Sequence, residues 1–217
     1  MTTCIVVLGG DRPDQRVRSY LPIEATVIAA DSGVDHALHL GLGIDLAVGD
    51  FDSVSLAGLA HLQHEHVSTE RYSVDKDASD GELALGAACD SGATDITVVC
   101  GGGVDRLDHL LVTAMMLTAP YLAGVAVTAW IGSAHVAVVR AGTPAHWSAT
   151  RGEIVTVLAV NGAANGVSTN GLQWHLEDED LQPGSSRGLS NIATSQRCSV
   201  SVRDGVLLVI RPDIVTA

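Results

Sequence analysis

The sequence predicts an α/β domain followed by an all-β domain: a Rossmann-like parallel sheet and then a C-terminal β-sandwich. In the first part of the chain, short aliphatic runs alternate with segments of helical periodicity, which is typical of a parallel sheet covered by helices on both faces. Beyond residue 133, short β patterns follow one another between Gly, Asn, Asp or Pro residues, with no helical period. We therefore expect two domains, residues 1–133 and 134–217.

Aliphatic runs mark the strands of the first domain. They are CIVVLGG (4–10), TVIAADSG (26–33), IDLAVGDFDS (44–53), DITVVCGGG (95–103) and GVAVTAWIG (124–132).

Helices are expected between these runs, where apolar residues recur at helical spacing. They begin near Val34, near Leu56, near Leu83 and near Leu107, and Pro120 stops the last one, whose Met115 and Met116 are expected in the core.

The second domain is expected to consist of short strands only. They are AHVAVVRAG (134–142), GEIVTVLAV (152–160), GVSTNGLQWHL (166–176), RCSVSVRDG (197–205) and VLLVIRP (206–212), the last two joined by an Asp-Gly hairpin turn.

Composition excludes several classes of function. The 217 residues are 47% hydrophobic and carry a formal net charge of −13, so a core can form while nucleic acid and anionic membrane surfaces would be repelled. Cys4, Cys89, Cys100 and Cys198 are scattered without paired spacing, which suits a reducing cytosol. With no signal peptide and no membrane-spanning run, we expect a soluble cytoplasmic protein without nucleic-acid or membrane partners.

Aspartates follow two of the predicted strands at the point where each strand ends. Asp31 comes directly after TVIAA, and Asp50 and Asp52 follow IDLAV just beyond Gly49. Ligands of open parallel sheets bind beyond the carboxyl ends of the strands, and alternate residues of an extended segment point the same way. Such oxygens suit Mg²⁺ shared with substrate phosphates, although aspartates are also common in turns.

The only lysine of the chain, Lys76, stands among aspartates in VDKDASD (74–80). Ser79 and Glu82 form a capping box, so a helix is expected to begin there with Asp80 in its first turn. A cation at a helix N-terminus is unfavourable unless an anion lies between them. A phosphate chain would be such an anion, whereas a solvated turn is the alternative.

A third cluster, CGGGVDRLDHLL (100–111), joins a glycine-ended strand to a helix. Gly101 and Gly103 allow close approach of the backbone to a phosphate, and Arg106 can bind it bidentately. Taken alone, Asp108 is more readily explained as a carboxylate in the first turn of the helix, and His109 as a residue on the helix surface.

In order, ADSG, GDFDS, KDASD, GGGVDRLDH and STNGLQWHL…GSSRGLSN resemble the thiamine pyrophosphokinase (thiamin diphosphokinase) family. The resemblance implies an α/β nucleotide-binding catalytic domain, a thiamine-binding β-sandwich, and a homodimer with sites between subunits. It also implies Mg²⁺-dependent transfer of diphosphate from ATP to the hydroxyl of thiamine, giving thiamine diphosphate and AMP.

Residue roles come with the resemblance. Asp31, Asp50, Asp52 and Asp80 match carboxylates that handle Mg²⁺ and ATP, and Lys76 and Asp77 match a lysine–aspartate pair. Arg106, Asp108 and His109 match an Arg-x-Asp-His segment, and Trp174, Ser190 and Asn191 match positions near the thiamine. Gly33, Gly101 and Gly103 are also expected to bind the nucleotide.

Two departures from the family pattern concern nucleotide contacts. Val104 and Asp105 stand where the family usually has two glycines, and Asp35 stands where it often has asparagine.

Mechanistic roles are expected for some of these side chains. Lys76 and Arg106 would stabilise phosphate charge, and either Asp77 or Asp108 would accept the hydroxyl proton. Trp174 either stacks on thiamine or packs in the sandwich core.

Other functions remain open from the residues. They are a 6-hydroxymethylpterin diphosphokinase, an Asp-x-Asp nucleotide-sugar glycosyltransferase, and a non-catalytic nucleotide or thiamine sensor.

Overall fold

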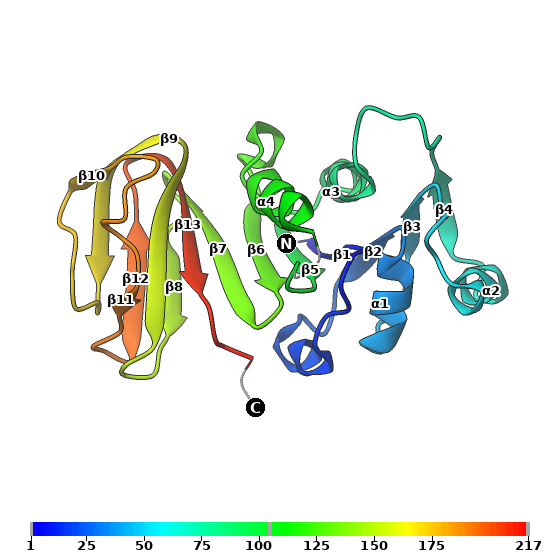
Figure 1. The fold of residues 1–217 in the computed structure, drawn as a ribbon, viewed down its shortest axis with the longest axis horizontal. Helices are drawn as coiled ribbons and strands as arrows, with labels where there is room; N and C mark the ends of the chain where they lie inside the picture. Colours follow the sequence, from blue (N-terminus) through cyan, green and yellow to red (C-terminus); the bar gives the residue numbers. More distant parts are fainter. Residues whose placement is uncertain (1, 104–105, 216–217) are drawn as a thin grey trace. The chain divides into compact units, whose positions relative to one another are not determined.

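The computed structural model describes residues 2–103 and 106–215 (Figure 1). Val104 and Asp105, which stand before the arginine where the family usually has two glycines, lie outside the described residues. The chain forms two compact units: one contains the residues up to Met116 together with Gly124–Ser133, and the other contains Leu117–Ala123 and the residues from Ala134 onward. Each unit is described by itself below.

The first unit contains a parallel sheet with strand order β4-β3-β2-β1-β5-β6. Its strands are β1 (Thr3–Val7), β2 (Thr26–Ala30), β3 (Leu46–Gly49), β4 (Ser68–Arg71), β5 (Asp95–Cys100) and β6 (Ala126–Ile131). The central strands are buried almost throughout, because helices cover both faces. The carboxyl ends of β1, β2, β3 and β5 therefore meet along one edge.

Helices of this unit connect successive strands. They are η1 (Gln15–Tyr20), α1 (Gly33–His39), α2 (Leu56–His64), α3 (Asp80–Asp90) and α4 (Leu107–Met116). Figure 1 shows α1 and α3 on opposite sides of the sheet. Helix α3 begins as predicted, because the Ser79 hydroxyl accepts the Glu82 N–H at 3.2 Å.

Helix α4 differs from its prediction in burial. It has no buried residue, and Met115 is 65% exposed, so the expectation that Met115 lies in the core is wrong.

The second unit is antiparallel, with order β7-β13-β9-β12-β8 and with β10 and β11 paired to β9. Besides η2 (Pro120–Leu122), it consists of β7 (Ala134–Arg140), β8 (Ala145–Ser148), β9 (Ile154–Asn170), β10 (Glu179–Leu181), β11 (Asn191–Ile192), β12 (Arg197–Ser201) and β13 (Asp204–Arg211). Valine, leucine and alanine side chains fill the core between its strands. The predicted fold class, α/β followed by all-β, is confirmed.

Strand β9 joins two of the predicted strands into one. It bends at Asn161 and Gly162, whose φ angles are 62° and 145°, so that its first half pairs with β13 and its second half with β12. Within residues 2–103 and 106–215, none of the helices has the length and apolar character needed to cross a bilayer.

Candidate active site

Three aspartates converge at the carboxyl ends of β2 and β3. Asp31, Asp50 and Asp52 each offer one carboxylate oxygen, and these oxygens all lie within 4.8 Å of one another. Asp31 Oδ2 accepts the Ser53 hydroxyl, whereas Oδ1 is buried without a hydrogen-bond partner in the described part of the chain. A buried anionic oxygen without a donor is costly unless a cation neutralises it. This hard-oxygen donor set therefore fits Mg²⁺.

The loop that carries Asp50 and Asp52 is anchored through the residue between them. Phe51 is buried with a φ of 65°, and the Arg71 guanidinium lies 5.3 Å from its ring centroid. The Asp52 N–H donates to Asp50 Oδ1 at 3.1 Å. The apolar anchor thus turns both flanking carboxylates toward the strand edge.

A second anchor holds the far end of this loop. Asp35, in the first turn of α1, accepts the Ser55 N–H at 2.8 Å and the Ser55 hydroxyl at 2.5 Å. Ser55 also caps α2, because its Oγ accepts the Gly58 N–H at 3.0 Å. Asp35 therefore ties the acidic loop to α1, a role that the sequence pattern does not predict.

Lys76 lies between two carboxylates that come from different elements. Its Nζ is 2.8 Å from Asp50 Oδ2 and 3.1 Å from Asp80 Oδ1. The hydrogen bond that Lys76 donates to Asp50 raises the pKa of Lys76 and lowers the pKa of Asp50. For Asp80, burial raises the pKa more than the neighbouring Lys76 lowers it, so the pKa of Asp80 is raised. Lys76 therefore remains an ammonium at neutral pH.

Asp52, the exposed member of the three converging aspartates, has a pKa that depends on the charge of the other two. The negative charge of Asp50 raises the pKa of Asp52. Repulsion of this kind is relieved when a cation binds between the carboxylates.

A pocket of about 820 Å³ opens beside Asp31 at the same edge. It brings together seven of the predicted residues: Asp31, Asp80, Gly101, Gly103, Arg106, Asp108 and His109. Gly9, Gly10, Asp11 and Ser53 also line it and were not predicted. The glycines after the first strand were the signal that would have found this part of the pocket.

Arg106 and Asp108 form a bidentate ion pair on the pocket wall. Arg106 Nε is 2.9 Å from Asp108 Oδ1, and Nη2 is 2.7 Å from Oδ2, with both side chains exposed. The hydrogen bonds from Arg106 hold the pKa of Asp108 far below its usual range. Asp108 is consequently a weak base while this pair persists.

Two predicted glycines are required by close packing. A Cβ on Gly33 would collide with the carbonyl oxygen of Val7, and one on Gly101 would collide with that of Asp11. Gly33 thus lets α1 approach β1, and Gly101 lets the pocket loop approach the chain after β1.

Asp77 and His109 are exposed on the first unit. Asp77 neither lines the pocket nor belongs to the group of three converging aspartates.

The three residues predicted near thiamine lie together in the second unit. The buried Asn191 side chain accepts the Trp174 N–H at 3.0 Å and donates to the Trp174 carbonyl at 2.7 Å. Ser190, with a φ of 55°, donates its N–H to Thr156 Oγ1 at 3.1 Å. Asn191 therefore fixes the backbone of Trp174, and the Trp174 residue is 47% exposed rather than part of the core.

Comparisons with known proteins agree over both units. Residues 17–129 match the family described as "Thiamin pyrophosphokinase, catalytic domain", and residues 147–207 match "Thiamin pyrophosphokinase, vitamin B1 binding domain". These matches do not favour a pterin kinase, a glycosyltransferase or a sensor. No curated protein sequence matched the chain.

Solved structures share the fold. Thiamine pyrophosphokinase from Bacillus subtilis has a TM-score of 0.83 at 20% identity, covering 98% of this chain and 99% of that one. The Geobacillus thermodenitrificans enzyme has a TM-score of 0.80 at 23% identity, covering 98% of each chain. The Candida albicans enzyme has a TM-score of 0.76 at 14% identity, covering 98% of this chain and 89% of that one.

Proposed function

This chain belongs to the thiamin pyrophosphokinase family, and we propose that it transfers diphosphate from ATP to thiamine with Mg²⁺ held by Asp31, Asp50 and Asp52. The observation that carries the metal assignment is the convergence of three carboxylates around the unpartnered Asp31 oxygen. Bound Mg²⁺ would neutralise triphosphate charge that these aspartates would otherwise repel.

Lys76 is proposed to bind a phosphate oxygen while remaining paired with Asp50 and Asp80. An ammonium has three donors; one is hydrogen-bonded to Asp50, and Asp80 lies at ion-pair distance, so at least one donor is left for a substrate. The carboxylates fix the direction of this donor, so the lysine loses little freedom when the nucleotide binds.

Arg106, which lines the pocket, is proposed to bind a phosphate oxygen in the same way. Two of its five N–H donors are directed at Asp108, and the others remain for a phosphate group. Chemistry of this kind depends mainly on positioning and charge neutralisation.

The remaining assignments follow the domain architecture. We propose residues 1–133 as the nucleotide-binding catalytic domain and 134–217 as the thiamine-binding domain, with Trp174 forming an aromatic wall for the cationic thiamine.

The four cysteines are free, which supports a cytoplasmic location. Exposed apolar residues on α4 support a homodimer.

One assay tests the reaction and the metal assignment together. The protein with Mg²⁺, ATP and thiamine should form AMP and thiamine diphosphate in equal amounts. Asp52→Asn should reduce this turnover by about 10²-fold or more, because the charge-neutralising site loses one anionic ligand. Circular dichroism should show that the variant is folded, and near-normal turnover by Asp52→Asn would refute the metal role.

A further inference from the structure

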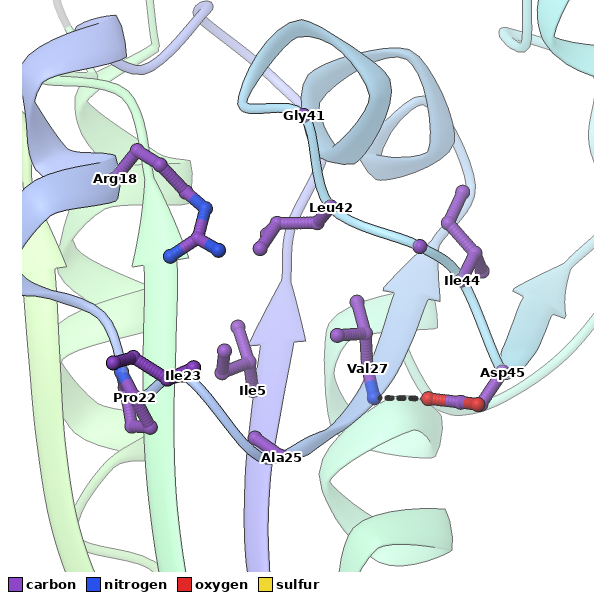
Figure 2. Close-up of a pocket in the computed structure, with 11 residues that line it drawn as sticks. Ile5, Arg18, Pro22, Ile23, Ala25, Val27, Gly41, Leu42, Ile44 and Asp45 are labelled. Carbon is purple, nitrogen blue, oxygen red and sulfur yellow. Dashed lines mark hydrogen bonds between the residues drawn. The ribbon is translucent and has the colours of Figure 1, made fainter.

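A second pocket, of about 280 Å³, lies at the amino ends of β2 and β3, away from the acidic edge. Buried side chains of Ile5, Val27, Leu42 and Ile44 form its walls. Figure 2 shows the Arg18 guanidinium pointing from η1 into the space between these apolar side chains. The active-site assignments above use none of these residues.

Arg18 is the feature that makes this pocket a candidate binding site. Its guanidinium has no hydrogen-bond or ion-pair partner within the described part of the chain. Its neighbour Arg16 differs, because it forms a 2.6 Å ion pair with Asp14. A guanidinium beside an apolar wall, with unused planar donors, is suited to a carboxylate.

The charge at the other side of the pocket limits the ligand further. Asp45 Oδ2 accepts the Val27 N–H at 2.8 Å, so this carboxylate is already tied to the backbone (Figure 2). Its negative charge disfavours a polyanion and a ligand with anionic groups at both ends. The apolar walls between Arg18 and Asp45 instead favour an uncharged hydrocarbon tail.

We propose that this pocket binds a small aliphatic monocarboxylate, with the carboxylate on Arg18 and the tail between Ile5, Leu42 and Ile44. Exposed Ile23, 91% accessible at the rim, would be covered by such a ligand. Because the pocket lies at the opposite ends of the strands from the acidic site, the ligand would not compete with a nucleotide bound at that site.

The probe is sodium 4-methylpentanoate, titrated into the full chain with ¹³C-labelled isoleucine methyl groups and followed by NMR. The methyls of Ile5, Ile23 and Ile44 should shift saturably, with Ile210 of β13 unmoved. The same shifts should occur in the presence of Mg²⁺, ATP and thiamine. No saturable shift, or loss of the shift when nucleotide is added, would overturn the proposal.

Variants separate the Arg18 interaction from general hydrophobic binding. Arg18→Gln should weaken the probe at least about tenfold, because a hydrogen bond to a charged group is lost. Arg16→Gln, two residues away and outside the pocket, should leave the affinity unchanged. Equal weakening by both variants, or none by Arg18→Gln, would contradict the assignment.

Two further probes test the chemical class. The uncharged 4-methylpentan-1-ol should bind at least about tenfold more weakly than the carboxylate, since it lacks the charge-assisted hydrogen bonds. Inorganic phosphate should not shift the isoleucine methyls. If phosphate shifts them and the carboxylate does not, the site is a phosphate site and the proposed ligand class is wrong.

Discussion

Asp35 is a side chain outside the pocket that holds the loop carrying the proposed metal ligands Asp50 and Asp52. Its carboxylate receives both donors of Ser55, at the end of the loop that begins with Asp50. Asp35→Ala removes both bonds, and we expect kcat to fall about tenfold or more, because misplacement of catalytic groups by about 1 Å costs up to 10²-fold. Steady-state kinetics should show little change in the KM for thiamine.

Asp35→Asn is the matched variant for this prediction. The amide can accept the Ser55 N–H and donate to its hydroxyl, so most of the activity should return. Equal loss of kcat in both variants would argue that the negative charge of Asp35, and not its tether, is what matters.

Replacing Trp174 should change thiamine binding without changing the stability of the protein. Because Asn191 holds its backbone and its surface is half exposed, Trp174→Ala should leave thermal stability nearly unchanged. Loss of a cation–π wall should raise the KM for thiamine about threefold to thirtyfold, with a modest loss of kcat. The KM of Trp174→Phe for thiamine should lie between those of the unchanged protein and Trp174→Ala. An unchanged KM in Trp174→Ala would show that this residue is not part of the thiamine site.

At the scale of elements, hydrophobic periodicity predicted the buried strands and missed the exposed ones. Strand β4 has four exposed residues, Ser68–Arg71, so its sequence carries no apolar signal although it pairs with β3. The sequence predicts two strands in place of β9 because Asn161 and Gly162 are typical turn residues, whereas they bend one continuous strand. Local signals identify turn residues, but pairing decides whether a strand ends there.

Two helical glycines, Gly33 and Gly86, should respond oppositely to replacement by alanine. A Cβ at Gly33 in α1 would collide with the Val7 carbonyl, whereas a Cβ at Gly86 in α3 meets nothing within 4 Å. Gly33→Ala should therefore destabilise the protein by about 1–3 kcal/mol through overpacking. Gly86→Ala should stabilise it by about 0.5–1 kcal/mol through helix propensity. Denaturant unfolding measures both, and a shift of the same sign in the two variants would contradict the packing argument.

For the molecule as a whole, topology explains why much of the acidic site could be predicted. Parallel strands deliver their carboxyl ends to one edge, so Asp31, Asp50 and Asp52 had to converge once the sheet was recognised. Side-chain pairing was not predictable in this way. The ion pair between Arg106 and Asp108, and the position of Lys76 between Asp50 and Asp80, depend on loop conformations that no periodicity encodes.

The exposed face of α4 bears on assembly of the molecule. Leu107, Leu111 and Met115 are each more than half exposed on one helix, and such an apolar surface is unfavourable in water unless a partner covers it. Because a homodimer is part of the proposed function, we expect a second copy to cover this face. Leu111→Glu should place a charge in that contact and shift the molar mass measured by light scattering from dimer toward monomer.

Leu56→Glu is the matched control, because Leu56 is 87% exposed at the start of a different helix, α2. It adds the same charge to the same kind of residue and should leave the mass unchanged. If active sites form between subunits, Leu111→Glu should also lose specific activity on dilution while Leu56→Glu does not. A dimer that is unaffected by Leu111→Glu would show that α4 is not the contact, since a buried unpaired carboxylate would have to be tolerated at no cost.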